Sequence, residues 1–225
     1  TSDSAFQGSL DGLVELGFPA ALGTRTEVDG SRIDLAAGVA NTATGAAAQP
    51  DEAVRIASNT KMFTAVVVMQ LVDEGAVGLD APIETVLPGL VRGDGIDGNR
   101  ITVRQLLQHT SGLPEYMATV LDADPMLQDY RSPRDLLDLA LAQPAVAEPG
   151  AGWAYSNTNY ILLGLLIERL TGDPYETAVE ERIIAPLGLE ATSAPRGGDR
   201  GIEGDHPRGD HPTPEGELVD ATELD

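Results

Sequence analysis

The stretch that decides the fold is SNTKMFTAVVVMQLVDEG, residues 58–75. Its apolar content predicts a buried helix over residues 59–74. Gly75 suits the position after the last helical residue, because glycine adopts a left-handed backbone without steric cost. The side chains predicted to be buried are Met62, Phe63, Val66, Val67, Met69 and Leu71. A buried helix needs other elements packed around it, so this one indicates the centre of a globular region.

Two polar residues at the start of this helix suggest nucleophilic chemistry. Ser58 and Lys61 are three positions apart, so their side chains share one face of the helix. A serine hydroxyl needs a base held beside it, and a lysine amine against apolar surface can serve. The helix N-terminus adds N–H groups that can stabilise an oxyanion. Lys61 is the only lysine among 14 basic residues, and arginine could not take its place as a base.

A second polar group follows in Tyr155-Ser156-Asn157, placed before another apolar helix. A tyrosine hydroxyl near a lysine can be held partly ionised and can move a proton. The Asn157 amide is a candidate group for holding a substrate carbonyl. Trp153, the only tryptophan, is a candidate pocket wall, although a lone tryptophan is as often part of a core.

The composition narrows the range of functions. The 225 residues include 36 acidic and 14 basic side chains, for a net charge of -22. A field of this sign repels nucleic-acid phosphates and anionic lipid, so neither is an expected partner. Without Cys, disulfides and thiol catalysis are excluded. The sequence predicts no membrane span. From its first residues, Thr1 to Asp3, we expect a secreted or cell-envelope protein whose signal peptide has been removed.

The first part of the chain predicts a helix and a hairpin. Apolar residues at helical spacing cover residues 4–16, and two extended stretches, 19–28 and 31–40, flank Asp29-Gly30, a strong hairpin signal. Residues 54–57 resemble a short strand. We expect residues 1–57 to form part of an α/β region.

Later segments predict helices from their end signals. The expected starts are Thr102, Ser132-Pro133, Asn157 or Asn159, and Asp173-Pro174. Gly172 should end the third of these helices, and the fourth should end before Pro186. We therefore expect a helical region over residues 58–195 and a polar connecting loop over 196–225. A lone hairpin is marginal in water, so the sheet is expected to be incomplete in these residues.

The combination of Ser-x-x-Lys and Tyr-x-Asn resembles the serine β-lactamase-like family, which includes class C β-lactamases and D-alanyl-D-alanine carboxypeptidases. The similarity extends along most of the chain. It includes residues 70–75 with Leu79-Asp80, residues 101–113 with His109-Thr110-Ser111-Gly112-Leu113, and Pro149-Gly150. The resemblance implies an α+β fold, with an antiparallel sheet flanked by helices beside an all-helical region.

The resemblance also implies roles for single residues. Ser58 would be the acylated nucleophile, Lys61 its activating partner, Tyr155 the proton shuttle and Asn157 a ligand for substrate amide. The implied activity is that of a serine-type D-alanyl-D-alanine carboxypeptidase that binds penicillin and needs no cofactor. A class C-like β-lactamase, an esterase and a D-aminopeptidase remain alternatives, as does a non-catalytic sensor of penicillin or peptidoglycan.

One feature of the family is missing. Its third motif, Lys- or His-Thr-Gly on a strand, does not occur, because no lysine follows Lys61 and Ser111 follows His109-Thr110. We therefore expect a C-terminal remainder, in the same chain or in a cleaved second chain, to supply this motif and the missing strands.

Simpler interpretations stand beside these predictions. Ser58 could be an ordinary helix cap and Asn157 another. For His109, at a helix end, a structural role is favoured over pairing with a serine. Asp205-His206 and Asp210-His211 could suggest a metal site, but their Gly- and Pro-rich flanks favour a solvated loop, so no metal is expected.

Overall fold

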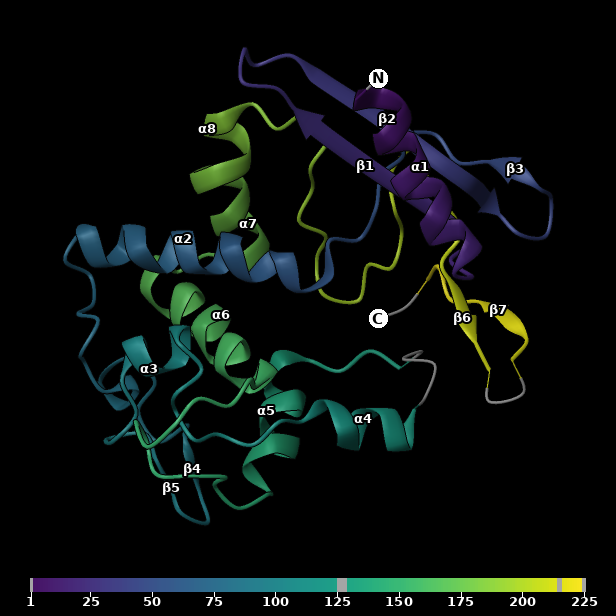
Figure 1. Ribbon diagram of the computed structural model, residues 1–225. Helices are drawn as coiled ribbons and strands as arrows, with labels where there is room; N and C mark the ends of the chain where they lie inside the picture. The colour runs from purple at the N-terminus through teal and green to yellow at the C-terminus, as the bar shows by residue number, and fades with distance from the viewer. Residues whose placement is uncertain (1, 125–128, 214–215, 224–225) are drawn as a thin grey trace. The chain divides into compact units, whose positions relative to one another are not determined.

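The computed structural model describes residues 2–124, 129–213 and 216–223 (Figure 1). They fall into two units, one made of residues up to 55 with those from 200 onward, and one of residues 56–199. The fold is α+β, with small antiparallel sheets and several helices. The sequence prediction instead set residues 196–225 apart as a connecting loop. None of the helices in the described ranges has the length and apolar character needed to cross a bilayer.

The first unit is a helix packed on a hairpin. Strands β1 (Ala20–Thr26) and β2 (Arg32–Asn41) pair antiparallel from Ala20 opposite Gly38 to Thr26 opposite Arg32. Helix α1 (Ser2–Glu15) packs on both strands (Figure 1). Buried Leu10, Ala21 and Ala37 form a small core between them. The predicted helix and hairpin are both present, and strand β3 (Ala46–Ala47) extends the sheet.

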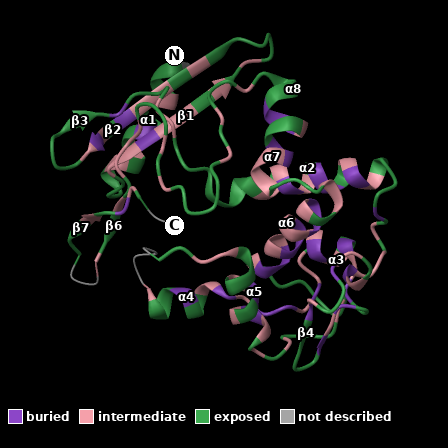
Figure 2. Cartoon of the chain, turned by 180° about the vertical axis from the view of Figure 1, so that it is seen from behind, coloured by how far each residue is buried: buried purple, intermediate pink, exposed green. Residues whose placement is uncertain are grey.

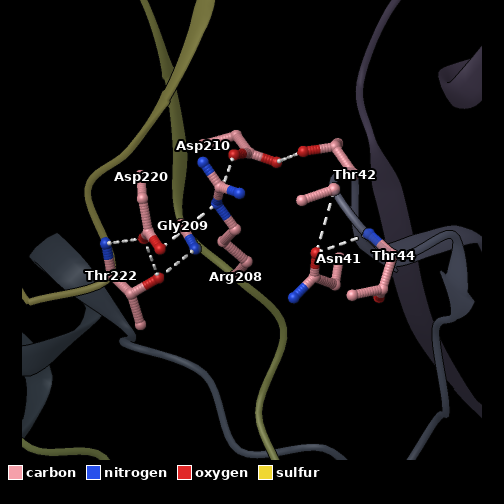
Figure 3. A network of polar contacts seen from close by, with 9 residues as sticks. Asn41, Thr42, Thr44, Arg208, Gly209, Asp210, Asp220 and Thr222 are labelled. Atoms are coloured by element: carbon pink, nitrogen blue, oxygen red, sulfur yellow. Dashed lines mark hydrogen bonds and ion pairs between the residues drawn. The ribbon is translucent and has the colours of Figure 1, made fainter.

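Polar contacts attach a second hairpin to the end of β2 (Figure 3). Strands β6 (Asp210–Pro212) and β7 (Leu218–Asp220) form this hairpin, where the sequence predicted a polar loop. Thr42 donates a hydrogen bond of 2.7 Å to Asp210. The Arg208 guanidinium pairs with Asp210 at 2.9 Å and with Asp220 at 3.3 Å. A buried carboxylate requires such partners, and they hold residues distant in sequence together.

The second unit is helical, with α6 (Asn157–Thr171) at its centre. Leu162, Leu163, Leu166 and Ile167 on α6 are completely buried (Figure 2). Helix α6 packs against α2 (Thr60–Asp73), α3 (Val103–Leu107), α5 (Pro133–Leu141) and α7 (Tyr175–Val179). The unit also contains α4 (Met117–Ala123), a π-helical segment (Glu180–Ile184), α8 (Ala185–Leu187), and the two short paired strands β4 (Arg92–Gly93) and β5 (Ile96–Asp97).

Several helix ends follow from local sequence signals. Thr102 and Ser132 each make a capping box with the residue three positions later. Gly75 and Gly172, at φ of 75° and 82°, follow the ends of α2 and α6. The residue before α6 is Ser156, so the prediction of an asparagine cap was wrong.

Two other predicted boundaries were also wrong. Residues 54–56 form no strand, and Ala57–Asn59 form a 3-10 turn instead. Helical structure continues past Pro186 to Leu187, because the π-helical segment Glu180–Ile184 runs directly into α8.

Helix α2 is buried on one side only. Val67 and Val68 have no exposed surface and Leu71 has 2%. Met62, Val66 and Met69, all predicted to be buried, are 61%, 46% and 45% exposed. In the described residues α2 packs against α6 and α7, which cover one face of the helix. An apolar run without a helical period could not indicate which face this would be.

Candidate active site

Four side chains predicted from the two motifs meet in the second unit. The Lys61 amine donates hydrogen bonds to Ser58 Oγ at 3.2 Å and to Asn157 Oδ1 at 2.8 Å. The Tyr155 hydroxyl lies 2.9 Å from Ser58 Oγ. The serine hydroxyl therefore lies within hydrogen-bonding distance of both an amine and a phenol, each of which can exchange a proton with it.

A tight turn presents Ser58 to this cluster. Ser58 lies in the 3-10 turn Ala57–Asn59, just before α2, and Lys61 is the second residue of α2. The turn forces Ala57 to a φ of 45°, a left-handed conformation that costs a residue with a Cβ about 1–2 kcal/mol. Such strain tends to occur where neighbouring structure holds a functional residue in place.

Glu115 fixes the orientation of Asn157. One carboxylate oxygen, Oε2, accepts the Asn157 backbone N–H at 2.5 Å and its side-chain Nδ2 at 3.0 Å. The other oxygen, Oε1, accepts the Met117 N–H at 2.9 Å. With Nδ2 held by Glu115, the Asn157 amide turns its Oδ1 toward Lys61. Asn157 is thus the first residue of α6, with its amide bonded within the site, and it does not cap the helix.

The cluster changes the acidity of Tyr155. Partial burial acts to raise the pKa of its hydroxyl, but hydrogen bonds with Lys61 and Ser58 and the positive charge of Lys61 together hold this pKa below its ordinary value. The Lys61 amine also lies 5.0 Å from the centre of the Tyr155 ring and 5.5 Å from that of Tyr160. The phenolate is therefore more accessible here than in an ordinary tyrosine.

An imidazole ring packs against Tyr155, and a tryptophan packs against that imidazole. The His109 ring stacks on Tyr155 at 4.5 Å between ring centres. The hydroxyl at hydrogen-bonding distance from Ser58 is that of Tyr155, so the structure gives no support to a Ser58–His109 pair. Trp153 packs edge-on against His109 at 6.4 Å and is 69% exposed. Trp153 is therefore more exposed than Tyr155, which is 43% exposed.

Two further serines have structural contacts. Ser156 is 1% exposed and donates to the Pro114 carbonyl at 3.1 Å. Ser111 is 2% exposed and donates to Asn159 Oδ1 at 2.5 Å. Both hydroxyls are buried and bonded inside the unit, so neither competes with Ser58 as a nucleophile. No group of three or more His, Asp and Glu side chains in the described ranges is arranged to hold a metal ion.

The comparison with known proteins identifies the family. The Beta-lactamase family model matches residues 26–220. Penicillin-binding protein 4 of Amycolatopsis lactamdurans is 34% identical over 163 residues, which are 72% of this chain and 41% of that protein.

Solved structures show the same relationship. A D-stereospecific amidohydrolase from Streptomyces sp. has a TM-score of 0.90 and 37% identity, over 98% of this chain and 65% of that one. The D-amino acid amidase of Ochrobactrum anthropi SV3 has a TM-score of 0.82 and 32% identity, over 99% and 62%. The chain spans less than two thirds of the length of each of these proteins. The matched length and the shared fold show that this chain belongs to the β-lactamase family of serine hydrolases.

Proposed function

We propose that the chain hydrolyses an amide bond of a D-amino acid substrate through an acyl-enzyme on Ser58. The observation that carries this proposal is the position of Ser58 Oγ, 3.2 Å from the Lys61 amine and 2.9 Å from the Tyr155 hydroxyl. Lys61 or Tyr155 takes the hydroxyl proton as the Ser58 oxygen bonds to the substrate carbonyl carbon. The C–N bond then breaks, and the leaving amine receives a proton through Tyr155. Water releases the acyl group and restores the Ser58 hydroxyl.

Asn157 contributes to this step through Lys61. Its Oδ1 holds the amine beside Ser58, and its Nδ2 carries a second hydrogen that a substrate carbonyl can use. Two similar proteins support substrates with D-residues, a D-stereospecific amidohydrolase and a D-amino acid amidase.

The first candidate substrate is a peptide that ends in D-alanyl-D-alanine, which makes the protein a carboxypeptidase acting on peptidoglycan-type peptides outside the cell. Penicillin binding in a relative supports it. The second candidate is the amide of a free D-amino acid. The net charge of -22 favours it, because at neutral pH such an amide carries an ammonium group, whereas the peptide carries a carboxylate.

Product analysis separates the two candidates. The protein is incubated with a D-alanyl-D-alanine peptide whose amino group is blocked, and separately with D-phenylalanine amide. Free D-alanine from the first reaction supports the carboxypeptidase, and ammonia from the second supports the amidase. The matching L-substrates are the controls, and faster turnover of the L-forms would contradict D-specificity.

A labelled penicillin tests the acyl-enzyme itself. We expect a covalent adduct that peptide mass mapping places on Ser58, and none in Ser58→Ala. Rapid release of the adduct would support a β-lactamase, and cleavage of a simple ester in preference to amides would support an esterase. An adduct without turnover of any substrate would favour a sensor. If wild type forms no adduct and turns over no substrate, the proposal is wrong.

We also propose that a further segment, in the same chain or a separate one, completes the site. No Lys- or His-Thr-Gly occurs in the 225 residues, and the relatives extend beyond the matched part. Intact mass of the purified natural protein, under native and denaturing conditions, tests this. A natural mass equal to that of these residues, with full activity, would contradict it.

A further inference from the structure

His109 contacts the chain on both sides of Tyr155. Its backbone carbonyl accepts the Ala154 N–H at 2.9 Å. Its ring nitrogen Nδ1 accepts the Ser156 N–H at 3.2 Å. Between these two peptide groups lies Tyr155, whose ring stacks on the imidazole with 26° between the planes. One residue therefore holds the segment before the tyrosine, the segment after it and the ring itself.

The backbone of His109 is strained to make these contacts. Its φ is 56°, and Ala57 is the other non-glycine residue with a positive φ among those that the structure describes. Both lie at the cluster: Ala57 precedes Ser58 and His109 supports Tyr155. A conformation that costs about 1–2 kcal/mol persists only where surrounding contacts determine it.

The hydrogen bonds define one protonation state of the ring. Nδ1 faces the Ser156 N–H and also the Asn159 Nδ2, at 3.2 Å each. Ser111 donates to the Asn159 Oδ1 at 2.5 Å, which leaves the Nδ2 of the amide facing the imidazole, and both residues are buried. Two donors therefore point at Nδ1, which must carry a lone pair. The neutral ring then carries its hydrogen on Nε2.

We propose that His109 is a positioning residue for Tyr155, and that it works only as the neutral imidazole with its hydrogen on Nε2. This inference rests on the proposed function, in which Tyr155 carries a proton. Protonation would place an Nδ1–H against two N–H donors. The bonds to Ser156 and Asn159 would be lost, and the Tyr155 hydroxyl would no longer be held 2.9 Å from Ser58.

The surroundings of His109 favour its neutral form. Burial and the charge of Lys61 on α2 lower the pKa of the imidazole, and the Glu115 carboxylate acts in the opposite direction. The other titratable groups facing the ring are the hydroxyls of Tyr155 and Tyr160. Because the folded pKa is below the ordinary value of about 6.5, Tyr155 is held at neutral pH and is released as pH falls through the folded pKa.

Two variants separate the contacts of the imidazole. His109→Asn keeps an acceptor near the Nδ1 position and tolerates positive φ, but it cannot be protonated in this range. His109→Phe keeps a ring for Tyr155 and loses the acceptor. We expect His109→Phe to lower kcat about tenfold to a hundredfold, with KM changed much less. His109→Asn should retain more activity than His109→Phe. The fall in kcat at low pH that protonation of His109 causes should be absent from this variant. His211→Asn, an exposed change in β6, is the control.

Nitrogen NMR of the imidazoles provides a readout independent of turnover. The chain has three histidines, so His109→Asn assigns the signal. We expect an unprotonated Nδ1 at neutral pH and a titration that coincides with the acid limb of kcat in wild type. A protonated Nδ1 at neutral pH, non-coincident titrations, or a wild-type kcat and pH profile in His109→Phe would overturn the inference. If His109→Phe does not fold, the wild-type titration and His109→Asn decide.

Failure of this inference can be distinguished from failure of the proposed function. If wild type neither acylates on Ser58 nor turns over substrate, the proposed function fails. The positioning contacts can still be tested by the NMR titration of His109. They can also be tested by comparing how well ordered the Tyr155 ring is above and below the pKa of His109. If wild type is active and Tyr155 remains ordered when His109 is protonated, the positioning role alone is wrong.

Discussion

Lys61 donates to two acceptors at once, Ser58 Oγ and Asn157 Oδ1. A protonated lysine has three hydrogens and no acceptor, so it can satisfy both contacts. After losing a proton it keeps donors for Asn157 and gains a lone pair for Ser58. An arginine could donate in the same way, but its guanidinium does not lose a proton in proteins.

We therefore expect Lys61→Arg to slow acylation of Ser58 by about a hundredfold to ten-thousandfold, the usual contribution of a general base. The rate of penicillin adduct formation measures this. Arg134→Lys, the reverse exchange at an exposed position, is the control and should acylate at the wild-type rate. Wild-type acylation in Lys61→Arg would show that another group takes the serine proton.

Glu115 accepts hydrogens with both carboxylate oxygens, and Glu115→Gln cannot reproduce this. Whichever way the glutamine amide turns, its NH₂ faces either Asn157 or the Met117 N–H. We expect a loss of about 1–3 kcal/mol in the free energy of unfolding, measured in urea, and a lower kcat because Asn157 no longer directs Lys61. Glu181→Gln, at an exposed position, should leave both quantities unchanged. Equal stability of the two variants would contradict the assignment.

The sequence identified some of these residues and not others, for a physical reason. Ser58 and Lys61 are one helical turn apart, and their chemistry needs that spacing. Glu115 and Asn157 are 42 residues apart, and His109 and Ser156 are 47 apart. Only the packing of α3 and the following loop against α6 brings them together, and no local pattern encodes it. His109 could be singled out in the sequence, but its contact with Ser156 could not be predicted from it.

At the scale of elements, the two faces of α2 should differ in their effect on stability. Val66 is 46% exposed and Val67 is completely buried. We expect Val67→Ala to lower the free energy of unfolding by about 1.5–3 kcal/mol, through lost burial and a cavity. Val66→Ala should change it by less than about 0.5 kcal/mol. Urea unfolding of both variants measures the difference. An equal loss for Val66→Ala would show that another segment or partner covers this face in the protein.

The elements with strong local signals were predicted well. The capping boxes at Thr102 and Ser132 and the turn at Asp29-Gly30 depend on residues within one or two turns of chain. The strands β4 to β7 are two or three residues long, too short to show a period of two. In the hairpin β6–β7 the buried Asp210 carboxylate pairs with Arg208, a contact that only the folded chain creates.

For the whole molecule, the charge of -22 predicts opposite salt effects on the two candidate substrates. Added salt screens the protein's field. Between low salt and about 0.5 M we expect kcat/KM for a cationic D-amino acid amide to fall by about threefold to tenfold. For the carboxylate-terminated peptide it should rise. A neutral ester is the control, with kcat/KM nearly constant. If kcat/KM changes in the same direction for both charged substrates, the electrostatic field of the protein does not discriminate between them.

The Lys61 amine, hydrogen-bonded to both Ser58 and Asn157, is also a natural reporter group. It is the only side-chain primary amine in the chain. Within these 225 residues, reductive methylation with isotope-enriched formaldehyde would therefore introduce one side-chain label, and its NMR resonance would need no assignment by mutagenesis. Occupation of the site by an inhibitor would be visible as movement of a single peak. Among the side chains of these residues, Lys61 is the one with which an aldehyde-bearing reagent would form an imine.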